Sequence, residues 1–413
     1  MASSSVSSIL GSLSSAGKAF EENGKGSREA LIEHSRVLIA ELEIPSEFIQ
    51  RSFWAEPAMS AIIRLAVDVR LFQTLKDAGE AGLSASALSE KTGVDIVLLE
   101  RLVRHLVSMH LITFHNGAFH ATRLSNGLAE DRYQHSISFC YDAARPSFNG
   151  FPAFFKKTGY TPPALGAHDG PFQDAHKTQL PFFEWLVSTP PHLQNFDSFM
   201  TAYRAGKADW HQPGFYPVSS RLMDGFNPSI SDVLLVDVGG GRGHDIAAFS
   251  AQHRTRPGRL ILQDREPVIA GVLTNGRELL PFEAQTHDFF TPQPVQSARA
   301  YYLHSILHDW GDEDGVRILE NLVPALKTGY SRVLLNEIVV HEERPTLAAT
   351  SMDMMMLAHF AVRERTEADW TALLQRAGLR VVRIYSHPGV AESLIEAELA
   401  GPSASSGCND SSG

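Results

Sequence analysis

The chain has few cysteines and no excess of positive charge. Cys140 and Cys408 are the only two cysteines among 413 residues, which excludes a disulfide framework and a cysteine-rich metal site. No metal is therefore predicted, and a reducing compartment fits best. Lys and Arg number 36 against 47 Asp and Glu, a net charge of −11, and this field opposes nonspecific binding to phosphate. We therefore expect no nucleic-acid partner.

Long apolar runs are also absent. Nowhere do the roughly 18 apolar residues needed to span a bilayer follow one another. The first residues, MASSSVSSILGSLSS, lack the basic region and apolar core of a signal peptide. We expect a soluble, cytoplasmic protein without a membrane partner. Val6, Ile9 and Leu13 recur at helical spacing, which fits a short helix or a frayed tail, and residues 401–413 have too few apolar residues to be ordered.

The remaining composition is that of a globular protein of two or three domains. The segment from Ser52 to Asp77 is apolar on most of a helical circumference, which predicts one helix buried in a core or a subunit interface. Ser84 and Asp95 can then cap two short helices, and the dipeptide at 116–117, Asn-Gly, predicts a hairpin turn. Helix, helix and hairpin form the pattern of a winged-helix module.

A winged helix suggests either DNA binding or a structural role in dimerisation. Its recognition helix would run from Asp95 to Leu111, where Arg101 and Arg104 are balanced by Asp95 and Glu100. The basic surface expected of a DNA reader is missing. Dimerisation is favoured, and a DNA-binding regulator stays open as an alternative.

The next segment, residues 146–228, is rich in Phe, Pro and Gly. It predicts helices and loops that line an apolar cavity, with Phe196 and Met200 as candidates for substrate contact. Aromatic residues at helical spacing are, however, more often part of a core.

From residue 229 onward, short apolar runs alternate with helical segments, which is typical of a parallel α/β sheet with crossover helices. The expected strands are Val233–Val238, Arg259–Asp264, Ala298–Leu303 and Ser331–Val340.

The first of these strands leads directly into a glycine-rich turn. The turn does not match the dinucleotide fingerprint, because the sixth position from Gly239 is His244. It is not a phosphate-binding P-loop either, because no Gly-Lys-Ser/Thr follows. Asp264 ends the next strand, where a carboxylate can accept hydrogen bonds from both hydroxyls of a ribose. These features predict a nucleoside site.

Seven motifs follow one another between Arg51 and Val381: LLVDVGGGRG, LILQD, HDFF, YYLHSILHDW, LLNEIV, MDMMMLAH and RERT. With them the chain resembles the class I S-adenosylmethionine-dependent O-methyltransferases, typified by the plant caffeate enzyme and by fungal polyketide-tailoring enzymes. The resemblance implies a Rossmann-like α/β methyltransferase sheet with an N-terminal winged-helix dimerisation domain, and a homodimer. It also implies S-adenosyl-L-methionine as cofactor and a phenolic hydroxyl of a small aromatic metabolite as acceptor.

The resemblance also assigns roles in cofactor binding. The glycine turn would pass under the methionine part, Asp264 would hold the ribose, and Asp288 and Phe289 would flank the adenine. His304 stands where the family usually has a Lys or Arg that touches the cofactor. The predicted cofactor-binding residues are Gly239, Gly240, Gly241, Asp264, Asp288, Phe289 and His304.

The chemistry asks the protein to align an oxygen with the activated methyl group and to remove its proton. His308, in ILHDW, is the predicted base, because a neutral imidazole accepts protons near neutral pH, the residue follows a strand end, and the family resemblance implies the base at this motif. Glu337 lies in an apolar strand, where a charge needs a partner. By the resemblance, Glu337 and Glu364 support His308. Without it, a salt bridge from Glu364 to a neighbouring arginine would be the simpler interpretation.

Acceptor contacts are assigned to Met356 and His359, with Asp353 helping to hold the pocket, although methionines at helical spacing are more often core. Phe360 replaces the acceptor-binding asparagine of plant relatives, so the acceptor is left open, including a nitrogen or sulfur acceptor.

One further alternative is a protein of this fold repurposed for pericyclic or dehydration chemistry. The predicted division of the chain is a helical or flexible segment at 1–50, the winged-helix-like dimerisation domain at 51–145, a connector lining the substrate pocket at 146–228, the catalytic domain at 229–400 and a disordered tail at 401–413.

Overall fold

The computed structural model describes residues 5–164, 169–275 and 280–401. These residues form two compact units. The first contains the described residues up to Pro162 and those from 169 to Gly206, and the second contains residues 163–164 and those from Lys207 onward. The predicted tail lies outside the described residues, except for Gly401. No helix in the described ranges is both long and apolar enough to cross a membrane.

The first unit begins with helices. The first residues were predicted to form either a short helix or a frayed tail, and the helix is correct. Ser5 caps the first helix by accepting a hydrogen bond from the Ser8 amide, and Ile9 and Ala16 are buried. The helices of this segment are α1 (Val6–Glu21), α2 (Ser27–Leu42) and α3 (Pro45–Gln50).

The single helix predicted from Ser52 to Asp77 is wrong. A π-helical turn comes first, and the chain then breaks at Arg70, whose φ of 54° is left-handed and cannot continue an α-helix. The break lets Leu71, Phe72 and Leu75 turn into the core. The elements are η1 (Arg51–Ala55), α4 (Glu56–Asp68) and α5 (Leu71–Ala78).

The winged-helix pattern is confirmed. Ser84 and Asp95 cap the two helices through their side chains, and positive φ angles of 52° and 76° at Asn116 and Gly117 close the hairpin. This unit contains α6 (Ala85–Thr92), α7 (Ile96–Ser108), β1 (Ile112–His115), β2 (Ala118–Ala121), α8 (Arg123–Leu128), α9 (Asp131–Ser138), η3 (Phe139–Ala144), α10 (Arg145–Lys157), α11 (Pro171–His176), α12 (Phe182–Ser188) and α13 (His192–Ala202).

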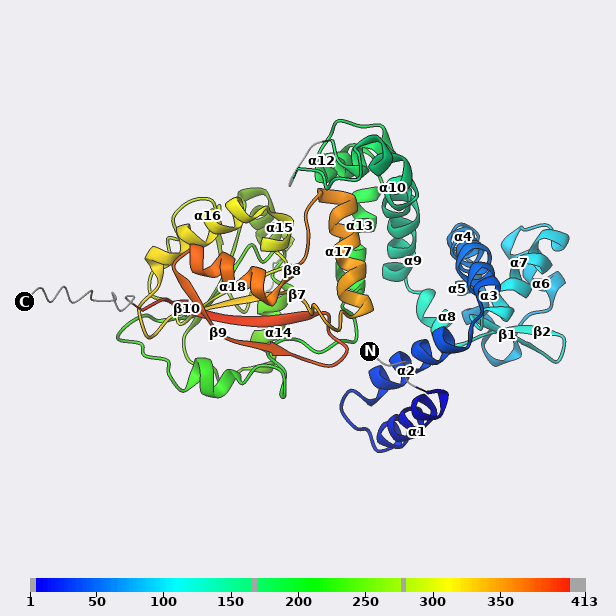
Figure 1. The fold of residues 1–413 in the computed structure, drawn as a ribbon, viewed down its shortest axis with the longest axis horizontal. Helices are drawn as coiled ribbons and strands as arrows, with labels where there is room; N and C mark the ends of the chain where they lie inside the picture. Colours follow the sequence, from blue (N-terminus) through cyan, green and yellow to red (C-terminus); the bar gives the residue numbers. More distant parts are fainter. Residues whose placement is uncertain (1–4, 165–168, 276–279, 402–413) are drawn as a thin grey trace, which may run out of the picture. The chain divides into compact units, whose positions relative to one another are not determined.

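The second unit is built on one mixed sheet (Figure 1), whose strand order is β5-β4-β3-β6-β7-β10-β9. Strands β5, β4, β3, β6 and β7 pair in parallel, as expected for all of them except β5, which was not predicted. The antiparallel hairpin that closes the sheet beside β7 was not anticipated. The strands are β3 (Val233–Val238), β4 (Arg259–Asp264), β5 (Glu283–Thr286), β6 (Ala300–His304), β7 (Arg332–Val340), β8 (Arg365–Thr366), β9 (Leu379–Ser386) and β10 (Glu392–Leu399).

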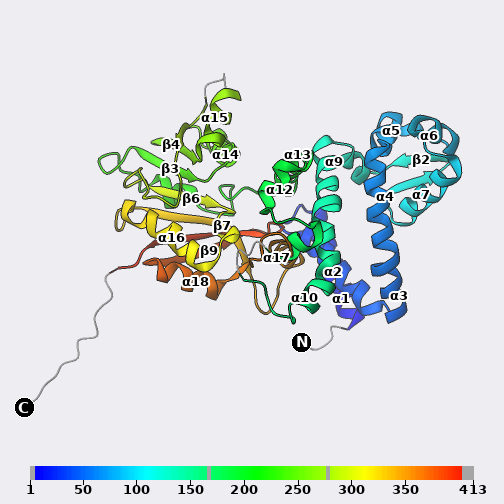
Figure 2. The same cartoon turned by 90° about the horizontal axis from the view of Figure 1, so that it is seen from above.

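Helices cover both faces of this sheet (Figure 2). Leu319 and Leu373 of α16 and α18 share a core with Val236, whereas Phe249 and Ile269 of α14 and α15 pack on the opposite face. The carboxyl ends of β3, β4 and β6 therefore meet at one edge, where α/β proteins bind ligands. The helices are α14 (His244–Gln252), α15 (Glu266–Asn275), η5 (Leu307–Asp309), α16 (Asp312–Leu322), α17 (Leu347–Phe360) and α18 (Glu367–Arg376).

Candidate active site

The glycine turn after β3 is folded tightly against its neighbours. The amides of Gly239 and Gly240 donate to the Gln263 carbonyl at 2.8 and 3.1 Å. A side chain at Gly240 would place its Cβ 2.5 Å from the Asp237 carboxyl carbon, and one at Gly239 would lie 2.8 Å from Ile306 Cδ1. Only glycine allows this backbone path, which leaves room at the strand end for a ligand.

Asp264 and the 287–289 segment lie beside this turn. Asp264 Oδ2 accepts the Gly241 amide at 2.8 Å, and the Asp264 carbonyl accepts the His287 amide at 2.9 Å. The Phe289 ring would be 3.6 Å from a Cβ at Gly239. A carboxylate can accept about four hydrogen bonds, so Asp264 keeps capacity for a ligand. The structure thus brings these predicted cofactor residues together.

His304 is tied to the start of α14. Its Nδ1 lies 2.7 Å from Asp245 Oδ2, which also accepts the Tyr302 hydroxyl at 2.8 Å. Burial, together with Asp245 and Asp264, raises the pKa of Asp237 well above its usual value. Neither Asp245 nor Tyr302 was predicted: Asp245 lies outside the seven motifs, and Tyr302 lies in YYLHSILHDW but had no role assigned. Asp245 could be suspected only as an acid in the first turn after the glycines.

His308 lies in the short turn η5, just beyond β6, and only 9% of it is exposed. Its Nδ1 is 2.9 Å from Glu364 Oε1, and its Nε2 is 3.5 Å from Asp309 Oδ1. Glu364 therefore contacts the imidazole directly. The arginines on either side of it pair with other acids, Arg363 with Asp369 and Arg365 with Asp312.

Glu337 contacts the backbone of the His308 turn. Its Oε1 accepts the amides of Ile306 at 3.0 Å and Leu307 at 2.8 Å. One oxygen of the buried carboxylate thus has two partners, and these hydrogen bonds fix the segment that carries His308.

The electrostatics of this cluster favour a protonated imidazole. Burial by itself lowers the pKa of His308, but the carboxylates of Asp309, Glu364 and Glu337 outweigh it and raise that pKa to about 10. Burial also raises the pKa of Glu337 to about 7, and it raises the pKa of Asp309. Such a cluster makes His308 a strong base once it has lost its proton.

The predicted acceptor residues of the connector belong to the first unit. Phe196 packs against three aromatic rings, with centroid distances of 5.3 Å to Phe139, 5.6 Å to Phe182 and 5.7 Å to Phe183. Met200, on the same helix, is 40% exposed. Phe196 therefore has a core environment within its unit.

The other predicted acceptor residues lie in the second unit. Met356 and His359 are buried on α17, which packs against η5. Asp353 of the same helix accepts the Glu364 amide at 2.8 Å, so it holds the residue that binds His308.

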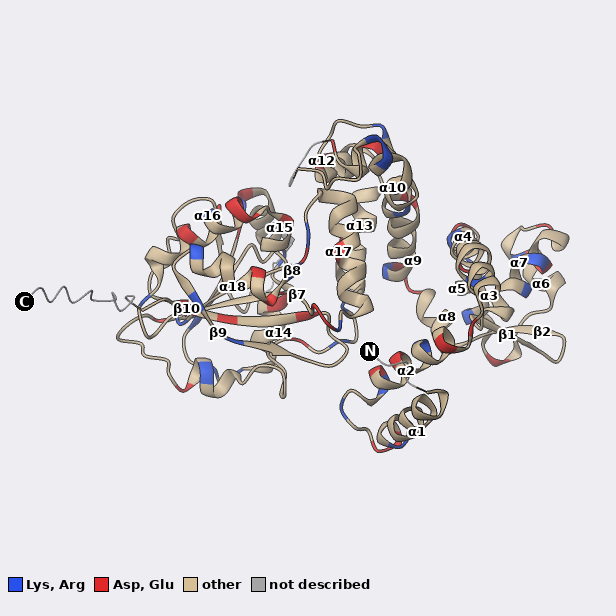
Figure 3. Ribbon diagram, viewed as in Figure 1, with Lys and Arg blue, Asp and Glu red and all other residues tan. Residues whose placement is uncertain are grey.

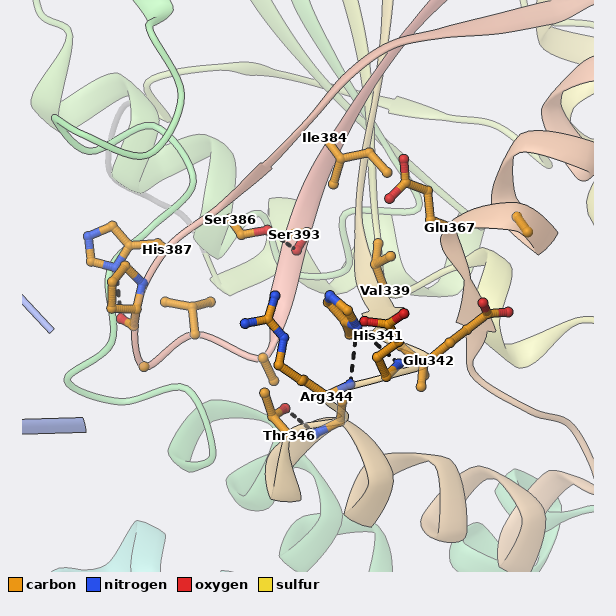
Figure 4. Close-up of a pocket in the computed structure, with 18 residues that line it drawn as sticks. Val339, His341, Glu342, Arg344, Thr346, Glu367, Ile384, Ser386, His387 and Ser393 are labelled. Carbon is orange, nitrogen blue, oxygen red and sulfur yellow. Dashed lines mark hydrogen bonds between the residues drawn. The ribbon is translucent and has the colours of Figure 1, made fainter. Parts of the chain in front are cut away.

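A cavity of about 720 Å³ opens beyond the end of β7 (Figure 4). Val339, Arg344, Ile384 and His387 are among its lining residues, and none of the predicted catalytic or cofactor-binding residues lines it. The cavity is thus distinct from the buried cluster around His308.

Comparisons with known proteins place this architecture in a family. Residues 221–380 match the O-methyltransferase domain, and residues 55–131 match the O-methyltransferase dimerisation domain. The chain is 63% identical over 400 residues to O-methyltransferase mpaG' of Penicillium brevicompactum, covering 97% of this chain and 100% of that protein.

Solved structures share the fold of this chain. One described as a pericyclic reaction enzyme is similar with a TM-score of 0.84 and 26% identity, over 94% of this chain and 98% of that one. The structure of LepI in complex with SAM has the same TM-score and identity, over 96% and 100%. The chain belongs to the O-methyltransferase family. It is an S-adenosylmethionine-dependent O-methyltransferase, and the predicted family, fold class, enzyme class and cofactor are confirmed.

Proposed function

We propose that this enzyme methylates a phenolic hydroxyl of a small, polyketide-like metabolite, with His308 as the general base. The observation that carries the proposal is the 2.9 Å contact between His308 Nδ1 and Glu364 Oε1. It lies in a buried turn at the edge of the sheet where Gly239 and Asp264 also lie.

The cofactor residues keep the roles that the family resemblance implies. Gly239, Gly240 and Gly241 would hold the methionine part, and Asp264 would accept from the ribose. Asp288 and Phe289 would hold the adenine, and His304, held by Asp245 at 2.7 Å, would take the position of the usual cation. When bound, S-adenosylmethionine supplies a methyl group that is already activated on a sulfonium.

His308 removes the proton of the acceptor. Its Nδ1 donates to Glu364, which fixes the tautomer in which Nε2 is the basic nitrogen. Nε2 would accept the hydroxyl proton of the acceptor, which leaves the oxygen able to receive the methyl group that bound S-adenosylmethionine would give up on becoming its demethylated product. The carboxylates that raise the pKa of His308 also make its neutral form a stronger base toward a phenol, whose pKa is about 10.

Acceptor recognition falls to side chains near this turn. We assign Met356 and His359 from α17 to the acceptor. Acceptor contacts of Phe196 and Met200, in the first unit, stay a prediction from the sequence.

Turnover tests the proposal directly. The purified enzyme is incubated with S-adenosylmethionine and a panel of phenols, and products are analysed by mass spectrometry. We expect a mass gain of one methyl group and an equal amount of demethylated cofactor. The matched control is each phenol with its hydroxyl removed, and methylation of those controls would contradict a hydroxyl acceptor.

Pericyclic chemistry is the second candidate, because a pericyclic reaction enzyme shares the fold at a TM-score of 0.84. The much higher identity of 63% to an O-methyltransferase favours methyl transfer. Product mass separates the two, since a cyclisation leaves the mass of the substrate unchanged.

A homodimer formed through the first unit is the third part of the proposal. The matched dimerisation domain exposes apolar side chains at the start of α7, where Val97 is 68% exposed. Just before the matched domain, which begins at residue 55, the side chains of Phe53 and Trp54 are 68% and 67% exposed. On α7 itself Arg104 is paired with Glu100 at 2.6 Å, and basic and acidic residues mix in this region (Figure 3), which suits a protein partner better than DNA.

Light scattering coupled to size-exclusion chromatography tests the dimer. We expect the mass of two chains, and a shift toward one chain in Trp54→Glu. Leu273→Glu, at a 56% exposed site of α15, is the matched control and should stay dimeric. A wild-type monomer at micromolar concentration would contradict the proposal. The cysteine-poor composition fits action in the cytoplasm.

A further inference from the structure

The local hydrogen bonds of the turn that carries His308 are too weak to fix its conformation. η5 contains three residues, and its two backbone hydrogen bonds, from Asp309 to Ile306 and from Trp310 to Leu307, are long at 3.3 Å. Ser305, just before it, has a φ of 50°, a strained conformation for a residue with a side chain. A single 3₁₀ turn is marginal in isolation, so side chains from elsewhere must set its position.

Arg365 binds carbonyl groups of this turn, whereas Glu337 binds its amides. Its Nη1 donates to the Leu307 carbonyl at 2.7 Å, and its Nη2 donates to the Trp310 carbonyl at 2.8 Å. These two carbonyls stand on either side of His308 and Asp309. The Arg365 side chain is only 3% exposed, so water does not compete for either hydrogen bond.

The guanidinium is itself held from two further directions. Its Nε donates to Asp312 Oδ1 at 2.9 Å, and its carbon lies 5.1 Å from the centroid of the Trp370 ring. Trp370 in turn donates its indole N–H to the Ile338 carbonyl at 3.0 Å. Planar, forked donors suit this arrangement, and an ammonium group could not reproduce it.

Three side chains thus fix one short turn. Glu337 binds its entering amides, Glu364 binds the imidazole ring, and Arg365 binds the carbonyls that bracket it. We propose that Arg365 is a positioning residue for methyl transfer, which aims His308 between Glu364 and the acceptor oxygen. This inference rests on the proposed function of His308 as the base.

Arg363 provides a matched control two residues away. Its side chain is 49% exposed and pairs with Asp369 at 3.0 Å, so Arg363→Gln makes the same chemical change outside the turn. We expect Arg365→Gln to lower kcat about 10- to 100-fold, since small misplacements of a reacting group have effects of this size. The KM of the acceptor and the Kd of the cofactor should stay within about twofold, and Arg363→Gln should leave kcat within about twofold.

Chemical rescue distinguishes positioning from a loss of folding. Arg365→Ala leaves a space that a guanidinium ion can enter, so millimolar guanidinium should restore part of its kcat and leave His308→Ala inactive. The inference is overturned if Arg365→Gln keeps its kcat, or if guanidinium rescues nothing in a variant that still binds the cofactor normally.

A crystal structure of Arg365→Gln keeps the inference testable even if the wild type methylates no phenol, which would instead refute the proposed function. We expect His308 to have left Glu364 in this variant and to remain at Glu364 in Arg363→Gln. An unmoved His308 in Arg365→Gln would contradict the positioning role.

Discussion

His308 and His341 lie just beyond the ends of β6 and β7, which are paired neighbours in the sheet. His308 is buried, and both of its ring nitrogens face carboxylates. His341 is exposed, and its Nδ1 accepts the amides of Glu343 and Arg344, both at 3.2 Å (Figure 4).

The cavity beside His341 and the turn of His308 differ in how far their ionisable groups are shielded from water. The cavity beside His341 is roomy, but its charged residues, such as Glu342, Glu343 and Arg344, are exposed to water. The turn of His308 instead holds ionisable groups away from water, and this is expensive unless the fold is built around them. The perturbed ionisable groups support the buried cluster, and not the cavity, as the site of the proposed reaction.

The largest expected effect comes from removing the buried imidazole. His308→Ala should lower kcat about 10²- to 10⁴-fold, the range that a general base contributes. The cofactor residues are untouched, so titration calorimetry should show an unchanged Kd for S-adenosylmethionine. His308→Gln, whose amide can still donate to Glu364, is the variant that best preserves folding and should be equally impaired.

A fully active His308→Gln would contradict the proposed difference between His308 and His341, because it would show that the buried histidine is structural. Loss of cofactor binding together with activity would likewise contradict the assigned role, because the defect would then lie in the fold or the cofactor site.

The next effect concerns the pH profile. The ring titrates with a pKa raised to about 10, and only the neutral ring acts as a base. The kcat/KM of the wild type should therefore rise with pH until about pH 10. Glu364→Gln removes a carboxylate that favours the imidazolium, so its rising limb should move to lower pH. Its plateau should be about tenfold lower because the base is weaker.

Protein stability should follow the same pKa. A histidine whose folded pKa is raised contributes stability that is complete below its unfolded value of about 6.5, and that stability is lost as the pH rises through about 10. The Tm of the wild type should fall more steeply from pH 7 to pH 10 than that of Glu364→Gln. Parallel Tm curves for the two proteins would contradict the raised pKa.

Local signals in the sequence were enough to predict much of this site. The glycine turn needs small residues in one short run, Asp264 ends a recognisable strand, and His308 follows one and stands in a family motif. Glu364 was found only through the family motif, because its contact with His308 joins segments 56 residues apart. Strands β3, β4, β6 and β7 of the parallel part could be predicted because each is a short apolar run, whereas β5 has the sequence EAQT and was not predicted.

The remainder depends on contacts that no local pattern encodes. The arginine at 365 could be read as a surface charge until the structure showed it bound to the Leu307 and Trp310 carbonyls. The break at Arg70 requires a left-handed backbone at a residue with no preference for it. The hairpin of β9 and β10 carries charges such as Arg383 and Glu396 within its strands, which masks the alternation of a half-buried strand.

The smallest expected effect is at the cavity beside His341, and it tests whether this cavity takes part in the reaction. His341→Gln and Arg344→Ala both change residues that line the cavity, and neither touches the carboxylate cluster or the glycine turn. Because both positions are exposed, the free energy of unfolding should change by no more than about 0.5 kcal/mol. Turnover should stay within about twofold at every pH measured. If either variant lost activity as His308→Gln does, the reaction centre would have to include the end of β7, and the buried cluster would no longer suffice to locate it.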